Sequence, residues 1–274
     1  MKTAVITGGT GGIGKAVAIA LARKQYRVII HGRDPEKTKQ AEQEIKTDSG
    51  NSNVESIAAD ISSLRGMKEL ADIIKSKTDI IHALILSTGV ILPKRIETVD
   101  GLESGFVIQY LSRFATTQLL MNELKKGKGR IVMVVAPVIP GATIHFEDIT
   151  LKKKFTIISA LSQEMFANHL FVQEFARRHP GNEVVINMAN PGFTDTGIVR
   201  RLPAPLRWAY SLVATKPEKA AQNFVYLASE EGVNFSGYIL NKSRKPGMKE
   251  KANHDPLVAQ KLWEKSMELI NPIL

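Results

Sequence analysis

Three glycines near the amino terminus have the spacing of an anion-binding turn. A short apolar strand leads into Thr7-Gly8-Gly9-Thr10-Gly11-Gly12-Ile13-Gly14, and an amphipathic helix is predicted over residues 15–24. In such a turn Gly8 permits a sharp reversal, Gly12 leaves room for pyrophosphate, and Gly14 lets the helix pack against the strand. The free N–H groups and the positive end of the helix dipole attract an anion. The segment therefore predicts a dinucleotide phosphate site.

Composition narrows the class of protein. The 274 residues are 43% hydrophobic, enough to bury the core of a single domain over residues 1–274. A formal net charge of +10 favours anionic partners, but no basic stripe with interleaved aromatic residues predicts nucleic-acid binding. The absence of cysteine excludes thiol nucleophiles, disulfides and thiolate metal sites. With a first strand near Met1 and no long apolar run, we expect no signal peptide or transmembrane segment and a cytoplasmic location.

Strand and helix patterns alternate along the whole chain. Residues 81–86 are apolar without alternation, which is typical of a strand covered on both faces of a parallel sheet. The order predicts an α/β fold with a Rossmann-like, doubly wound parallel sheet. Further strands are predicted at 27–31, 54–58, 130–136, 183–188 and 235–240, and further helices at 63–77, 102–124, 158–178, 217–229 and around 262–266. Another helix is predicted to begin at Pro35, with Asp34 as its cap.

The pattern breaks at about residues 194–214. This stretch is apolar, carries Trp208 and Tyr210, and is interleaved with arginines. Three interpretations stay open: a lid over an apolar substrate, a surface helix that touches a membrane or partner, and a packed excursion of the fold.

Taken together, these motifs resemble the short-chain dehydrogenase/reductase family, and within it the retinol-dehydrogenase-like branch. Ala167-Asn168-x-Leu170-Phe171 and Leu262-Trp263-Glu264-x-Ser266 are the segments most similar to that branch. The resemblance implies a homodimer or tetramer. From the residues themselves we expect a small apolar substrate and no metal. The resemblance also implies a set of cofactor-binding residues: Gly8, Thr10, Gly11, Gly12, Ile13, Gly14, Arg33, Asp60, Ile61, Thr88, Gly89, Pro191, Gly192 and Thr194.

The residue after the second strand bears on the choice between NAD and NADP. A carboxylate there usually grips the ribose hydroxyls of NAD, whereas an arginine binds the 2′-phosphate of NADP through charge-assisted hydrogen bonds. Arg33 stands at this position, beside Asp34. We therefore expect NADP rather than NAD, unless Arg33 merely points into solvent.

The resemblance also predicts that the usual catalytic groups are substituted. In the family, a Tyr and a Lys four residues apart on one helix protonate the carbonyl oxygen, with help from a Ser and an Asn. Alignment on Ala167-Asn168 places Leu161 at the Tyr position and Met165 at the Lys position. Ala136 and Gln109 then stand where the Ser and the Asn are expected. None of these four side chains transfers protons as a tyrosine does, so the catalytic residues stay unknown.

Other groups do not replace this machinery in an obvious way. Tyr238 and Lys242 have the right spacing, but they fall on a predicted strand whose rise separates them. The six histidines lack metal-ligand spacing, and Glu147-Asp148 is typical of a loop pair rather than a general-acid dyad. Gln109, Ser87 and Tyr110 are left as side chains that either reach a substrate or serve the structure.

Three functions remain. Loss of a general acid typically costs about 10²–10⁴ in rate, so an ordinary ketone should be a poor substrate. The first hypothesis is an atypical NADP-dependent oxidoreductase that transfers hydride to an apolar or conjugated carbonyl-type substrate, which needs less acid assistance. The alternative is a non-catalytic NADP-binding pseudoenzyme that acts as a sensor, scaffold or subunit of a partner enzyme. The third is non-redox chemistry in the same pocket.

Overall fold

The computed structural model describes residues 1–181, 183–192, 194, 215–241 and 249–274. These residues form an eight-stranded sheet in the order β3-β2-β1-β4-β5-β6-β7-β8, with the first seven strands parallel and β8 antiparallel to β7. The doubly wound α/β fold predicted from the sequence is confirmed. The strands are β1 (Thr3–Thr7), β2 (Arg27–Gly32), β3 (Val54–Ala58), β4 (Ala83–Leu86), β5 (Arg130–Val134), β6 (Val185–Asn190), β7 (Tyr238–Asn241) and β8 (Lys249–Lys251).

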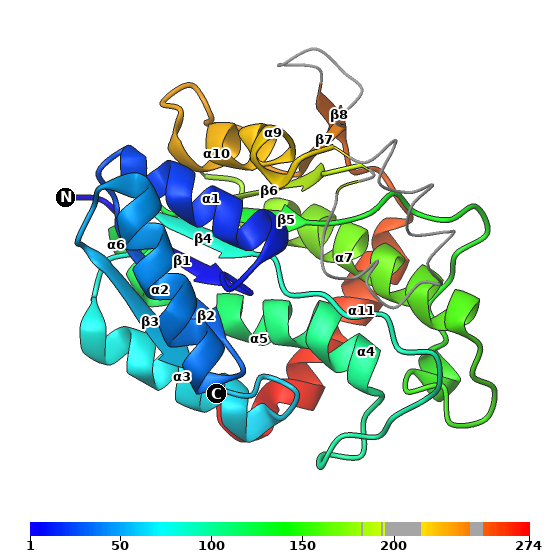
Figure 1. The fold of residues 1–274 in the computed structure, drawn as a ribbon. Coiled ribbons are helices and arrows are strands. Elements are labelled where there is room, and N and C mark those ends of the chain that lie inside the picture. Colours follow the sequence, from blue (N-terminus) through cyan, green and yellow to red (C-terminus); the bar gives the residue numbers. More distant parts are fainter. Residues whose placement is uncertain (182, 193, 195–214, 242–248) are drawn as a thin grey trace.

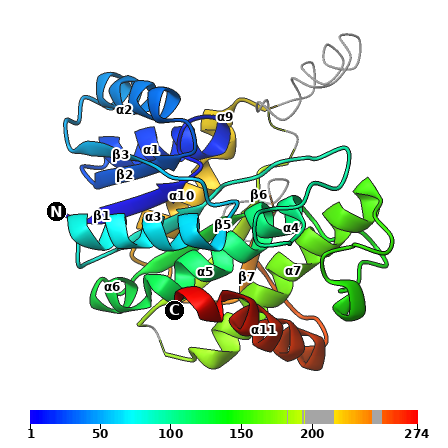
Figure 2. The same cartoon turned by 90° about the horizontal axis from the view of Figure 1, so that it is seen from below.

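Helices cover both faces of the sheet (Figure 1). The core on the face of α1 and α10 and the core on the face of α3, α5, α7 and α11 form two separate apolar clusters. Figure 2 shows the second of these faces from below. The helices are α1 (Gly12–Arg23), α2 (Pro35–Ser49), α3 (Leu64–Lys77), α4 (Ser104–Phe106), α5 (Ser112–Leu119), α6 (Met121–Lys126), α7 (Ile157–Arg178), α9 (Pro217–Ala220), α10 (Gln222–Ser229) and α11 (Pro256–Ile270).

The helix predicted over residues 102–124 is not continuous. A π-helical turn, Val107–Leu111, joins α4 to α5, and α5 ends at Leu119 before α6 begins. In this turn the Gln109 carbonyl oxygen accepts a hydrogen bond from the Asn168 side chain of α7, at 3.0 Å. A partner from another helix thus satisfies a backbone group within the irregular turn, which periodicity alone does not reveal.

A further difference concerns the last strand of the sheet. Strand β8 was not predicted, because its residues carry no apolar alternation and it is held by pairing with β7. In contrast, Asp34 caps α2 as predicted, by accepting a hydrogen bond from Lys37 N at 3.0 Å. The apolar stretch expected at about 194–214 lies, apart from Thr194, outside the described residues. Within the described ranges, no helix is both long and apolar enough to cross a bilayer.

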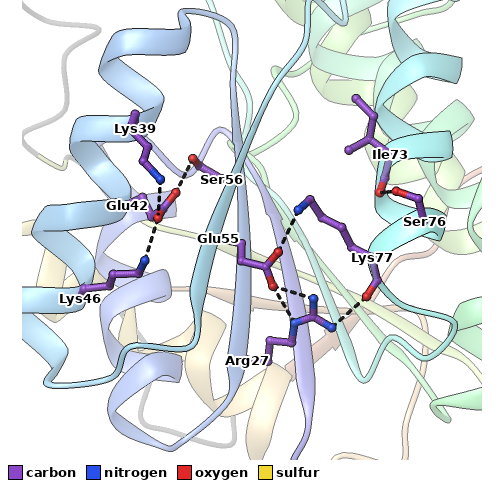
Figure 3. A network of polar contacts seen from close by, with 9 residues as sticks. All are labelled: Arg27, Lys39, Glu42, Lys46, Glu55, Ser56, Ile73, Ser76 and Lys77. Atoms are coloured by element: carbon purple, nitrogen blue, oxygen red, sulfur yellow. Dashed lines mark hydrogen bonds and ion pairs between the residues drawn. The ribbon is translucent and has the colours of Figure 1, made fainter.

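The β3 edge of the sheet is held by ion pairs (Figure 3). Glu55 of β3 accepts hydrogen bonds from Arg27 of β2 and from Lys77 at the end of α3. Glu42 of α2, which is buried, accepts from Lys39 and Lys46, at 2.9 and 2.7 Å, and from Ser56 of β3. These bonds tie α2 and α3 to β2 and β3 at this edge of the sheet.

Candidate functional site

The glycine turn between β1 and α1 is closely packed at Gly14 and open at Gly11. Gly8 and Gly12 have φ values of +71° and +54°, in the left-handed region that favours glycine. A Cβ on Gly14 would overlap the Gly8 carbonyl oxygen and the Ser87 hydroxyl, whereas one on Gly11 would meet nothing within 4 Å. Ser87, directly after β4, donates to Thr7 O at 2.6 Å and so fixes the turn from the neighbouring strand. The close approach predicted for Gly14 is confirmed.

Among the residues that the structure describes, no side chain caps the amino terminus of α1. Its N-cap residue, Gly11, has an extended backbone, and its first turn carries no acidic side chain. The N–H groups at this end face the glycine turn without a competing side-chain anion. The arrangement is the one that an anionic phosphate requires.

Arg33 directly follows the carboxyl end of β2, next to the glycine turn. Its side chain is exposed, and among the described residues it forms no ion pair or hydrogen bond. Asp34, in contrast, is occupied as the cap of α2. Just before Arg33, a Cβ on Gly32 would overlap the methyl group of Thr10, so the glycine turn and this position are neighbours.

The other predicted cofactor residues divide between exposed and buried positions. Ile13 and Ile61 are 6% and 5% exposed, and both belong to the apolar core. Asp60 is exposed and accepts a hydrogen bond from Ser62 N. Thr88 and Gly89 follow β4, and Thr88 N lies 3.0 Å from where a Cβ on Gly8 would stand. The segment after β4 therefore packs directly on the glycine turn.

The turn after β6 is fixed by its own side chains. Gly192 has φ +65°, and its N–H donates to Asn190 Oδ1 at 2.8 Å. Thr194 is buried and donates to Pro191 O at 2.9 Å. Because β4, β5 and β6 are parallel neighbours, this turn lies at the same edge of the sheet as Thr88 and Gly89.

A cleft of about 400 Å³ lies beside Ala136. His169 of α7 reaches Ala136 O through Nε2 at 3.2 Å, and its Nδ1 is buried without a partner in the described structure. Because a carbonyl only accepts, Nε2 carries the proton. Burial lowers the pKa of His169 to about 4, so the ring is neutral. The lining comprises Val135, Ala136, Pro137, Val138, His169, Asn190, Ile239, Asn241, Lys251, Ala252, Asn253 and His254.

Leu161 and Met165 lie one turn apart on α7. Their spacing places them on one face of the helix, and both side chains are half-buried. Neither carries a group that titrates. Any proton donor in this region therefore has to come from another position.

A polar cluster that the sequence did not reveal lies between α7 and the π-helical turn. It consists of Glu103, Gln109, Arg113, Glu164 and Asn168. Gln109 Nε2 donates to Glu164 Oε2, and Asn168 Nδ2 donates to the backbone oxygens of Gln109 and Glu164. Arg113 donates to Asn168 Oδ1, to Val134 O and, at 2.7 Å, to Thr88 O. The cluster thus connects α7 to the segment after β4.

Glu164 carries an unusual charge state for a glutamate. It is 3% exposed, and burial together with the nearby Glu103 raises its pKa to about 8, although Gln109 and Arg113 oppose this. Burial also lowers the pKa of Arg113 to about 10, which still leaves it cationic at neutral pH. At neutral pH this raised pKa favours the protonated form of Glu164, and Oε2 of that carboxyl group is in contact with the Gln109 amide. The sequence signal that could have revealed the cluster is the pair Glu164 and Asn168, four residues apart on one face of the α7 helix.

Several other candidates have structural partners. Ser87 is bonded to the glycine turn, and Tyr110 is fully buried with its hydroxyl 2.7 Å from Ser266 Oγ of α11. This contact gives the late Trp263-Glu264-x-Ser266 motif a packing role. Asp148 accepts from Lys152 N and Lys153 N, in keeping with a loop pair. Tyr238 lies on β7 as predicted, and Lys242 falls outside the described residues.

Comparisons with known proteins agree with this geometry. A model of short chain dehydrogenases matches residues 2–139. Retinol dehydrogenase 13 of Homo sapiens is 31% identical over 287 residues, covering 98% of this chain and 84% of the relative. Polyprenol dehydrogenase of Homo sapiens is 29% identical over 282 residues, with coverage of 98% and 84%.

Among solved structures, an uncharacterized protein from Mycobacterium paratuberculosis is similar with a TM-score of 0.75 and 25% identity, over 99% of this chain and 94% of the other. The RhlG–NADP complex of Pseudomonas aeruginosa has a TM-score of 0.72 and 21% identity, over 88% of this chain and 94% of the other, which reflects a shared fold. With its family model, its retinol-dehydrogenase relatives and its parallel sheet in agreement, this chain belongs to the short-chain dehydrogenase/reductase family of oxidoreductases.

Proposed function

We propose that this protein is an NADP-dependent oxidoreductase that lacks the usual tetrad and transfers hydride to an apolar or conjugated carbonyl-type substrate. The observation that carries the proposal is the glycine turn, which is closed against Ser87 and Thr88 and faces an uncapped helix end. The cofactor supplies the hydride when it is bound. The protein binds and orients both reactants, and Gly8, Gly12, Gly14, Thr88 and the turn at Gly192 are the groups placed to do so.

The preference for NADP rests on Arg33. With Asp34 occupied as a helix cap, the exposed Arg33 guanidinium is the group available to a 2′-phosphate. Charge-assisted hydrogen bonds of about 1.5–3 kcal/mol correspond to a preference of one to two orders of magnitude. We expect calorimetric titration to show NADPH binding at least tenfold tighter than NADH, and Arg33→Ala to remove that difference. Equal affinities in the unmodified protein would contradict the assignment.

The glycine turn itself offers a matched pair of variants. Gly14→Val introduces atoms against Gly8 O and Ser87, so NADPH affinity should fall by about 100-fold or more. Gly11→Ala adds a methyl group where no atom lies within 4 Å and where the backbone is extended, so binding should be nearly unchanged. Equal losses in both variants would show that the turn does not hold the cofactor as proposed.

The proposed substrate class follows from the residues that occupy the positions of the family's catalytic Tyr, Lys, Ser and Asn. Leu161, Met165, Ala136 and Gln109 supply no strong acid, so an acceptor whose developing charge is delocalised is favoured. Relatives at about 30% identity are named for retinol and polyprenol, both isoprenoid alcohols, which supports an apolar substrate. The test is NADPH oxidation with a panel of conjugated enones against matched saturated ketones. Faster turnover of the saturated ketones would overturn the proposal.

A second function is favoured by the same four positions. A non-catalytic NADP-binding protein needs the glycine turn and no proton donor beside the substrate. Tight NADPH binding, with no oxidation of the cofactor across the enone panel and co-purification of a partner enzyme, would support this alternative. The homo-oligomer and the cytoplasmic location stay predictions, which gel filtration with light scattering and cell fractionation would check.

A further inference from the structure

The contact between Gln109 and Glu164 joins a buried carboxyl group to the edge of the candidate cofactor site. The Gln109 amide spans the two: its Nε2 faces Glu164 Oε2, and its Oε1 lies 3.3 Å from where a Cβ on Gly89 would stand. Whichever amide atom faces Gly89 is thus opposite to the one that faces Glu164. Gly89 belongs to the segment that packs on the glycine turn.

The amide orientation depends on the proton of Glu164. An ionised carboxylate only accepts hydrogen bonds, so Gln109 has to present its NH₂ group to Glu164 and its oxygen to Gly89. A carboxylic acid whose proton lies on Oε2 donates instead, so the amide turns over and presents its NH₂ group to Gly89. The two amide ends are nearly isosteric, and their assignment follows from the hydrogen-bond network.

We propose that Glu164 is a positioning residue that sets, through its own proton, whether Gln109 offers a hydrogen-bond donor or an acceptor to the ligand beside Gly89. Three features of the structure carry this inference: the burial of Glu164, its bond to Gln109, and the position of the amide between Glu164 and Gly89. The inference deepens the proposed function and rests on it for its consequence in catalysis.

The charged groups around Glu164 favour the donor state. Glu103, which precedes α4 and caps it with both carboxylate oxygens, repels a second negative charge. Arg113 of α5 acts in the opposite direction but is shared among Thr88 O, Val134 O and Asn168. The raised pKa of Glu164, about 8, agrees with a protonated group at neutral pH.

A donor at this position has a clear use in the proposed reaction. A bound reduced nicotinamide would supply hydride to the substrate carbon, and the electron pair of the double bond would then move to the substrate oxygen. The N–H of Gln109 would stabilise that negative charge by a hydrogen bond, and water would supply the proton that completes the reduction. Gln109 remains a neutral amide throughout, and Glu164 keeps its proton.

The orientation is tested on the free protein by nuclear magnetic resonance. With glutamine-selective labelling, the Gln109 NH₂ protons should show contacts to the Gly89 α protons below a pH of about 8 and lose them above it. The midpoint of this change should coincide with the midpoint of the Glu164 carboxyl titration. Glu164→Gln should abolish this pH dependence, and the Gln118 amide on α5 serves as an internal control. An NH₂ group that stays on the Glu164 side at every pH, or the same titration in the Glu164→Gln protein, would overturn the inference.

A second variant keeps the test valid if Glu164→Gln folds poorly. Glu103→Gln removes the repelling charge, so the midpoint of the amide transition should move to lower pH together with that of the Glu164 carboxyl signal. A carboxyl midpoint that moves without the amide transition would also contradict the inference.

Catalysis supplies a separate readout. For an active enone substrate, kcat should fall above pH of about 8 in the wild type but not in Glu164→Gln, and Gln109→Leu should lower kcat by on the order of 10²-fold. Because the resonance experiment needs no catalysis, failure of the proposed function can be distinguished from failure of this inference. If the amide changes orientation with pH but no hydride is transferred, the proposed function is contradicted. If hydride is transferred but the amide keeps one orientation at every pH, this inference is contradicted.

Discussion

Two buried glutamates in this protein have opposite charge states. Glu42 and Glu164 are 4% and 3% exposed, so burial penalises the charge of both. At the β3 edge, bonds from Lys46, Ser56 and Lys39 outweigh that penalty and lower the pKa of Glu42 to about 2 (Figure 3). Beside the candidate site, burial and Glu103 raise the pKa of Glu164 to about 8. Neighbours, rather than depth, decide whether the carboxyl group keeps its proton.

The comparison separates a structural region from a candidate functional one. The bonds to Glu42 and Glu55 hold α2 and α3 against the sheet, and every carboxylate there is matched by cations. The polar cluster of Glu103, Gln109, Arg113, Glu164 and Asn168 contains two carboxyl groups and one cation, and that cation interacts with Glu164. Such an imbalance is costly for stability and is typical of sites where a proton is used.

The largest expected effect concerns Glu164→Gln. A pKa raised in the folded state contributes stability that is fully present below about pH 4.5 and is lost as the pH rises through about 8. The wild-type free energy of unfolding should therefore fall relative to that of the variant by on the order of 4–5 kcal/mol between pH 4.5 and 9. Urea unfolding at a series of pH values measures this. A constant difference across the series would show that Glu164 is ionised in the folded protein.

Glu42→Gln should show the opposite pH dependence. A lowered pKa contributes stability that is present above about pH 4.5 and is lost as the pH falls through about 2. We expect the variant to be less stable by about 2–3 kcal/mol at pH 7 and to approach the wild type in acid. The same urea series provides the measurement. If both glutamine variants lost stability in the same pH range, the contrast between the two regions would not hold.

Glu103→Gln sharpens the comparison by removing the like charge beside Glu164. The pKa of Glu164 should fall by roughly 1 unit, while burial keeps it above the ordinary value. Carbon-13 carboxyl resonances measure the midpoint, and the Glu42 resonance is the control that should not move. An unchanged midpoint for Glu164 would assign the whole shift to burial.

The smallest effect is expected for the lysines around Glu42. Lys39 is 64% exposed at its side chain, so Lys39→Ala should cost about 0.5 kcal/mol or less. Lys46 is 30% exposed, and its replacement by alanine should cost more. Thermal unfolding at neutral pH compares the two. A larger loss for Lys39 would mean that the exposed cation, rather than the half-buried one, compensates the charge of Glu42.

The sequence by itself determined the order of strands and helices and the position of the glycine turn. The continuous apolar run that contains β4, the Asp34-Pro35 helix start and the spacing of Gly8, Gly12 and Gly14 are local signals, because a short segment contains all the atoms that they describe. The family resemblance on these motifs was correct for the same reason.

Only the tertiary structure decided the charge states and the irregular helix. The Asn168 bond within the Val107–Leu111 turn, the Glu103 charge beside Glu164 and the Tyr110 contact with Ser266 join residues that are far apart in the chain. A hydrogen bond or a pKa depends on the atoms within a few ångströms, and those atoms come from several elements at once. The sequence shows which side chains can be protonated. The packing of α7 against the π-helical turn sets the surroundings of Glu164 and therefore its pKa.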